Sequence, residues 1–237
     1  MTPLYVDIDA LTGKFNAKLD QSLSKLDAFG NKATTIGSAM SIAISTPLIA
    51  LAGVLVKTAS NTEESLNKVN VAFKGSADQI VSFAKTTLDS YGIAEGTALD
   101  MAALYGDMAT SMGLPTSAAA DMSKSLVGLA GDLSSFKNIS IEVANNSLKS
   151  IFTGETESLK SLGIVMTEAN LAAFALSNGI QANIRDMSES EKVTLRYAYV
   201  MDKTANAQGD FARTGGGAAN QTRILQEGLK ELGDSFG

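Results

Sequence analysis

Paired carboxylates are the residues of this sequence whose types and spacing could do chemistry. Three pairs of acids stand close together in the chain: Glu63 with Glu64, Glu155 with Glu157, and Glu189 with Glu191. Two carboxyl groups at a suitable separation can hydrolyse a glycosidic bond. Each pair, however, lies at an expected helix start, where acids interact favourably with the helix dipole, and residues one or two apart on a helix do not face each other. We therefore expect these acids to serve helix starts.

The glycine run Gly215–Gly217 is the other segment with a chemical interpretation, as a phosphate cradle. No apolar strand precedes the run and no lysine follows it in P-loop spacing, so a hinge is the favoured interpretation. The chain has no cysteine and no histidine, which removes thiolate ligands, the usual general base and any Ser-His arrangement. We expect no enzyme, and no catalytic, cofactor-binding or metal-binding residues. An acid pair brought together only by folding stays open as the alternative.

Composition favours helical packing over a thick core. The 237 residues are 45% hydrophobic but only 6% aromatic, and tryptophan is absent. The net charge of -6 argues against a nucleic-acid-binding protein, because such binding depends on Lys and Arg neutralising phosphates. Asp7 and Asp9 stand where a secretory signal would carry positive charge, so a cleaved signal peptide is not expected.

Residues 1–60 are predicted to hold a long amphipathic, coiled-coil-like helix and an apolar segment. Apolar residues recur from Ile8 to Met40 with a mean step of about 3.6, close to the helical and coiled-coil periods. Two interpretations remain: a helix packed inside its own domain, or self-association with other copies. Gly13, Gly30 and Gly37 weaken a rigid coiled coil, each by about 1 kcal/mol relative to alanine.

The apolar segment, 33–56, is an uncharged run of 24 residues between Lys32 and Lys57, long enough to span a bilayer. Pro47 would kink a helix there, and the strongly apolar part, 48–56, is only nine residues long. Either the segment is buried in a bundle or oligomer, or it inserts into a membrane.

Residues 61–213 are predicted to form a multi-helix bundle of short helices, which makes the chain all-α. Capping residues and glycine stops suggest these helical stretches: Thr62–Gly75, Ser76–Gly92, Thr97–Gly113, Thr116–Phe136, Ser140–Gly154, Glu155–Gly163, Thr167–Gly179, and Ser188 onward with a capping box. Small residues at 118–120, 128, 130 and 131 favour close, antiparallel helix packing. The methionines at 101, 108, 112 and 122 are expected in the core, with an adaptable recognition groove as the alternative.

Expected apolar faces include Met101 with Leu104, Phe136, and Leu171 with Leu176. The helical pattern dissolves around 206–213. Residues 214–237 are predicted to be a glycine hinge and the start of a further helix, with Ile224, Leu225, Leu229 and Leu232 as its apolar stripe.

Three strings carry a resemblance to a known family: ALYGDMATSMGLPTSAAADMSKSLVGLAGDLSSF, LKSIFTGETESLKSLGIVMTEANLAAFALSNGI and MSESEKVTLRYAYVMDKTANAQGDFART. In residue type and order they resemble the phage tail tape measure family, over roughly Asn61–Gly237. The segment GSAMSIAISTPLIALAGVLVKTA is similar, less closely, to an apolar segment often found in that family.

The resemblance implies a structural phage tail protein, the N-terminal portion of a tape measure that sets tail length and leaves with the DNA at ejection. It implies as partners other copies of the chain, tail tube and tail tip proteins, and tail assembly chaperones, with no sequence-specific nucleic-acid binding. The implied locations are the tail lumen of the virion and the host cytoplasm during assembly. The alternative function is a membrane-inserting helical protein of pore or DNA-channel type, which uses 33–56 and reaches the host membrane.

Overall fold

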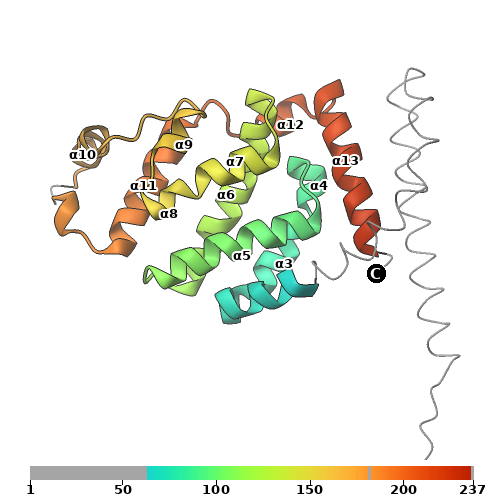
Figure 1. Ribbon diagram of the computed structural model, residues 1–237, viewed down its shortest axis with the longest axis horizontal. Coiled ribbons are helices and arrows are strands. Elements are labelled where there is room, and N and C mark those ends of the chain that lie inside the picture. Colours follow the sequence, from blue (N-terminus) through green and yellow to red (C-terminus); the bar gives the residue numbers. More distant parts are fainter. Residues whose placement is uncertain (1–62, 181–182, 236–237) are drawn as a thin grey trace, which may run out of the picture.

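The computed structural model describes residues 63–180 and 183–235, and these residues are all-helical with no strand among them (Figure 1). The all-α bundle of short helices expected from the sequence is thereby confirmed. The predicted long helix in 1–60 and the apolar segment 33–56 lie outside the described residues.

The helices follow one another with short connections. In chain order they are a helix over 63–73, the 3-10 helix η2 (Lys74–Ser76), α3 (Ala77–Ala84), α4 (Thr87–Tyr91), α5 (Glu95–Ser111), α6 (Thr116–Lys137), α7 (Ile141–Leu148), α8 (Ser150–Thr153), α9 (Glu157–Lys160), α10 (Glu168–Ser177), the 3-10 helix η3 (Ile184–Asp186), α11 (Glu189–Lys203), α12 (Asp210–Thr214) and α13 (Ala218–Ser235).

The α5–α6 pair forms the centre of the bundle, and α3, α4, α7, α12 and α13 pack against it, while α8 to α11 pack against one another and against α7. Small residues let the neighbours approach closely. A side chain at Gly106 of α5 would place its Cβ 2.1 Å from the Phe73 ring, and one at Gly131 of α6 would lie 2.8 Å from the backbone oxygen of Tyr91. The predicted close approach at residue 131 is confirmed, because only a glycine leaves room there for α4.

Several predicted helix starts are confirmed by side-chain caps. The Ser140 hydroxyl accepts a hydrogen bond from the Val143 amide at 3.3 Å, and the Thr167 hydroxyl accepts one from the Asn170 amide at 3.1 Å. Ser188 forms the predicted capping box, at the start of α11. These caps satisfy amides that the first helical turn leaves without intrahelical partners.

Several predicted boundaries are wrong: the stretches Ser76–Gly92 and Ser140–Gly154 each hold two helices, and α12 forms where the helical pattern was expected to dissolve. Gly75 does not end a helix and Ser76 makes no side-chain cap, because η2 joins the helix over 63–73 directly to α3 and Lys74 takes the positive φ of 49°. Likewise α5 begins at Glu95, two residues before the predicted Thr97. Its first amides are satisfied by acids of a distant helix, a source that local sequence does not reveal.

Some predicted core positions are also wrong. Leu104 is 37% exposed and Phe136 is 50% exposed, since the buried face of α5 runs instead through alanines and the fully buried Tyr105. On α10 only Leu171 and Ala175 are buried, which leaves Leu176 65% exposed. The core prediction for methionine holds for residues 101 and 122, whereas those at 108 and 112 are partly buried.

Candidate functional site

A short segment after α11 forms a buried polar junction with α6. Gly209 precedes α12 in the left-handed conformation, at φ 74°, and Asp132 of α6 contacts the segment. The Asp132 carboxylate accepts the Gly209 amide at 2.7 Å and the Phe211 amide at 3.1 Å. The side chain is only 5% exposed, so a buried acid fixes the start of α12 on α6.

A second group of contacts holds the end of α12. The Ser135 hydroxyl donates to the Asp210 carboxylate at 2.6 Å and accepts from the Asn220 amide at 2.8 Å. The same Asn220 amide donates to the Thr214 hydroxyl at 2.9 Å. These contacts link α6, α12 and the first turn of α13. We call the whole group the α12 junction, made of Asp132, Ser135, Gly209, Asp210, Phe211, Thr214 and Asn220.

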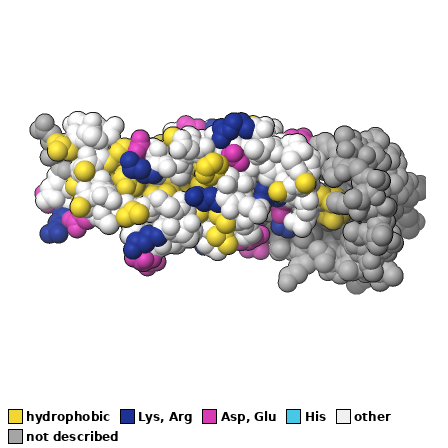
Figure 2. Space-filling view, turned by 90° about the horizontal axis from the view of Figure 1, so that it is seen from above, with side chains coloured by type: hydrophobic (Ala, Val, Ile, Leu, Met, Phe, Trp, Pro, Cys, Tyr) yellow, Lys and Arg dark blue, Asp and Glu magenta, His cyan; other side chains and the backbone are white. Residues whose placement is uncertain are grey.

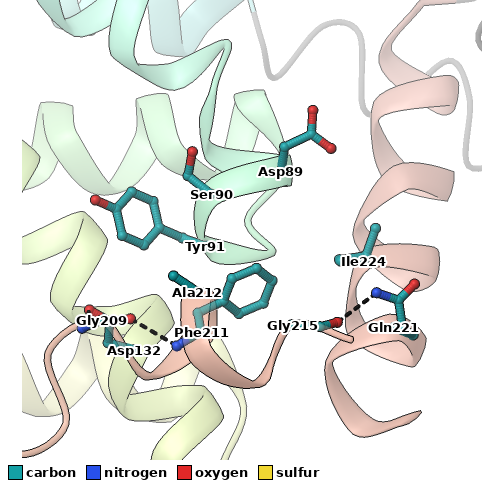
Figure 3. A pocket seen from close by; sticks show the side chains of 10 residues that line it. All are labelled: Asp89, Ser90, Tyr91, Asp132, Gly209, Phe211, Ala212, Gly215, Gln221 and Ile224. Carbon is teal, nitrogen blue, oxygen red and sulfur yellow. Dashed lines mark hydrogen bonds between the residues drawn. The ribbon is translucent and has the colours of Figure 1, made fainter. Parts of the chain in front are cut away.

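A cleft of about 650 Å³ opens at the α12 junction, between α4, α12 and α13 (Figure 3). Tyr91 and Phe211 line it from two sides, and Ile224 of α13 lines it from a third. Phe211 packs so closely under α4 that a Cβ on Gly92 would lie 2.6 Å from its ring. The cleft is thus lined by aromatic side chains, and both oxygens of Asp132 accept hydrogen bonds from backbone amides.

Burial raises the pKa of Asp132 above its ordinary value. The Gly209 and Phe211 amides act in the opposite direction, while the neighbouring Asp210 adds to the increase. Burial also raises the pKa of Tyr91, with a smaller contribution from the charge of Asp132. The hydrogen bonds from these two amides do not offset the effect of burial on the pKa. The negative charge of Asp132 therefore costs the folded protein free energy.

The α13 helix is docked on the bundle by polar side chains that meet the ends of other helices. Arg223 donates to the backbone oxygens of Ser134 and Ile139, at 3.1 and 3.3 Å, next to the C-terminal end of α6. A cation at this end satisfies free carbonyls and interacts favourably with the negative end of the helix dipole.

Acids of α13 perform the complementary task at the start of α5. Glu227, which is 6% exposed, accepts the Ala94 amide at 3.2 Å, and Glu231 accepts the Glu95 amide at 2.9 Å. Lys230 pairs with the Glu227 carboxylate. One helix thus caps the positive end of α5 and the negative end of α6, which explains why α5 has no side-chain cap of its own.

The acid pairs predicted at helix starts are all exposed, and the structure does not bring them together. Glu64 pairs with Lys68 at 2.9 Å, Glu157 with Lys160 at 2.7 Å and Glu189 with Lys192 at 2.9 Å. On the face in Figure 2, Lys and Arg side chains likewise lie among Asp and Glu side chains. Within 63–180 and 183–235, no group of acids could hold a metal ion.

The residues that hold the α12 junction and α13 were missed by sequence reasoning. A buried contact of Asp132 could have been predicted, because this residue is a lone acid beside the apolar stripe of a helix. Asn220 and Glu227 gave no such signal, because the apolar stripe of α13 was expected to be the buried one. The structure buries these two polar residues and leaves Ile224 and Leu225 partly exposed.

Comparisons of the chain with protein-family models, with curated proteins and with solved structures find no match. In the part of the chain that the structure describes, no helix combines the length and apolar character needed to cross a membrane.

Proposed function

We propose that this chain is a structural phage tail protein, the N-terminal part of a tape measure that sets tail length during assembly and is released with the DNA at ejection. The observation that carries the proposal is the agreement between the family-like strings and the contacts that build the bundle. The string AQGDFART contains four residues of the α12 junction, and its partner acid, Asp132, lies in the family-like string that ends at Phe136. The family-like strings therefore include residues that hold α12 on α6.

The described residues suit an assembly role. Their buried polar groups act as caps and tethers between helices: Asp132 holds α12, and Arg223 and Glu227 hold α13. Such a bundle is a compact module and not an extended ruler helix, so we place the length-setting part of the tape measure outside this chain.

The finer features belong to the same proposal. Residues 1–60 form a long helix whose stripe, from Ile8 to Met40, associates with other copies, and Gly215–Gly217 serves as a hinge. The partners are the tail tube and tail tip proteins and the tail assembly chaperones. The chain resides in the tail lumen of the virion after a period in the host cytoplasm.

Mass spectrometry of purified virions tests this proposal. Peptides of the chain are expected in intact particles and in isolated tails, and they should be depleted from particles that have ejected their DNA. Capsids without tails supply the matched control, since they should lack these peptides. Virions that contain no peptide of the chain would contradict a structural tail role.

A second candidate function is membrane insertion through 33–56, which the uncharged run between Lys32 and Lys57 favours. Flotation of the chain with lipid vesicles tests it. A chain without residues 48–56 should lose flotation if this function is correct, while the substitution Gln226→Ala at an exposed position should leave it unchanged. Flotation that persists without 48–56 argues against the second candidate.

A further inference from the structure

A largely apolar groove lies beside α5 on the surface of the described residues. It has a volume of about 730 Å³ and lies between the helix over 63–73 and α5, with Asn145 of α7 at one side. Buried Ala72, Met101 and Ala103 form its apolar floor, while Val71 at 68% exposure and Leu104 at 37% form its lips. We call this hollow the α5 groove.

The α5 groove shows two features of an unfilled seat. Its two lips are large aliphatic side chains left in water, although both neighbouring helices have buried faces elsewhere. In addition, the Oδ1 atom of Asn145 is buried and has no hydrogen-bond partner within the described residues. A buried acceptor without a partner costs free energy, so an occupant that brings a donor would relieve that cost.

We infer that the α5 groove seats residues 48–56 of the same chain. This run, LIALAGVLV, is the most apolar of the sequence. Leu48, Leu51, Ala52 and Leu55 have the spacing of anchors that one helical face presents to a groove. Thr46 and Thr58, on either side of the run, supply the hydroxyl donors that an unpartnered amide oxygen needs.

The length of the connection favours this occupant over a second copy. Residues 57–62 separate the run from the helix over 63–73, and six extended residues span about 20 Å. The lip residue Val71 lies eight residues into that helix, a rise of about 12 Å from residue 63. A tether of this length gives an effective concentration of about a millimolar, far above that of a free chain in a dilute solution.

Seating would cover the apolar run and the aliphatic lips of the groove together. This inference does not depend on the proposed tail function, because it concerns only which segment of the chain covers which surface. It also bears on membrane insertion, since a seated run is unavailable to a bilayer until it leaves the groove.

Disulfide trapping tests the seat, and the absence of cysteine from the chain provides a clean background. The full chain with Leu51→Cys and Leu104→Cys is oxidised at low micromolar concentration, and intrachain disulfide formation is followed by gel mobility and mass. The control pair joins Leu51→Cys to Asn70→Cys, an exposed position on the same helix as Val71 that does not line the groove. We expect the groove pair to form its intrachain disulfide about tenfold faster than the control pair, at a rate independent of tenfold dilution.

A second groove pair, Leu51→Cys with Val71→Cys, guards against a folding defect, because the side chain of Val71 is largely exposed and tolerates replacement. Circular dichroism confirms that each variant keeps its helical content. Equal rates for groove and control pairs would overturn the inference. So would disulfides that form only between chains and vanish on dilution, since they would identify a second copy as the occupant.

Discussion

At the scale of single residues, Asp132 holds the start of α12 against α6. Its two oxygens accept both backbone amides that start α12, and no other side chain supports those amides in the described residues. The charge itself is unfavourable there, because burial raises the pKa of Asp132. Acceptor geometry, and not charge, is therefore what the junction takes from this carboxylate.

Replacement of Asp132 by alanine should destabilise the protein markedly. The variant leaves two buried amides without an acceptor, and relief of the buried charge offsets part of that cost, so we expect a loss of about 2–4 kcal/mol in the free energy of unfolding. Urea unfolding followed by circular dichroism measures it. Asp121→Ala on the same helix removes only an exposed ion pair with Lys124 and should cost less than about 1 kcal/mol. Similar losses for the two variants would show that Asp132 is not a tether.

The raised pKa of Asp132 predicts how the cost of Asp132→Asn depends on pH. A carboxyl with a raised folded pKa binds its proton more readily in the folded state, so wild type gains stability as pH falls through that pKa towards the ordinary value of 3.8. Asparagine does not titrate. The free energy of unfolding of wild type should therefore rise relative to that of Asp132→Asn between pH 7 and pH 4, as measured in parallel urea titrations. A difference that narrows on acidification would mean that the folded pKa is lowered.

Substitution of Tyr105, unlike that of Asp132, is expected to leave stability unchanged or to raise it. Its ring is fully buried and stacks on Phe152 at 5.8 Å, while its hydroxyl has no partner within the described residues. Removal of an unpartnered buried hydroxyl with retention of the ring should leave stability unchanged or raise it by about 1 kcal/mol, so Tyr105→Phe is expected to melt at or above the wild-type temperature. Tyr197→Phe, in a partly buried position on α11, is the control. A clear loss of stability in Tyr105→Phe would reveal an acceptor for the hydroxyl.

The sequence predicts local residue roles well and distant ones poorly. Ser140, Thr167 and Ser188 were identified as caps because the donor and the acceptor lie within three residues of each other. Asp132 pairs with residues 77 and 79 positions away, and no local pattern encodes such a pairing. The exposed acid pairs agree with the helix-start interpretation for the same reason, since their lysine partners are three or four residues away.

At the scale of elements, α13 is held unlike the other long helices. Its buried residues Asn220 and Glu227 are polar, whereas α5 and α6 bury mainly apolar faces. A helix docked by a few directed polar contacts loses its place when one contact is removed, while an apolar interface distributes the loss. We therefore expect α13 to be the long helix most sensitive to single substitutions.

Hydrogen exchange tests the docking of α13 directly. Glu227→Ala removes the acceptor of the Ala94 amide and should lower local stability by about 1–2 kcal/mol, which speeds exchange of α13 amides by about 5–30-fold. Gln226→Ala changes the exposed neighbour on the same helix and should leave exchange unchanged. Equal protection of α13 in wild type and Glu227→Ala would show that the apolar side of the helix provides the docking energy.

The order of the helices follows from sequence better than their number or their faces do. Glycine stops at residues 92, 154 and 179 fall where the chain turns, because positive φ at these positions suits glycine. The faces of α5 and α13 were predicted wrongly, because periodicity counts large apolar residues. In α5 small alanines form much of the buried face, and in α13 the polar residues reach the ends of other helices.

At the scale of the whole molecule, the described residues form one helical module in which α10 lies at one end and α13 at the other (Figure 1). The α12 junction connects the central helix α6 to the beginning of α13, so the bundle determines where the following helix starts. A module that fixes the direction of a following helix is suited to one end of an elongated assembly, as the proposed tail role requires.

The most direct test of the proposed tail role is the length of phage tails assembled with and without this chain, measured by electron microscopy. With the chain, the proposal predicts tails of one length. Without it, tails should be absent or broadly distributed in length, and expression from a plasmid of the tape measure that contains this chain should restore the single length. Tails of normal, uniform length in the absence of the chain would contradict the tape measure proposal.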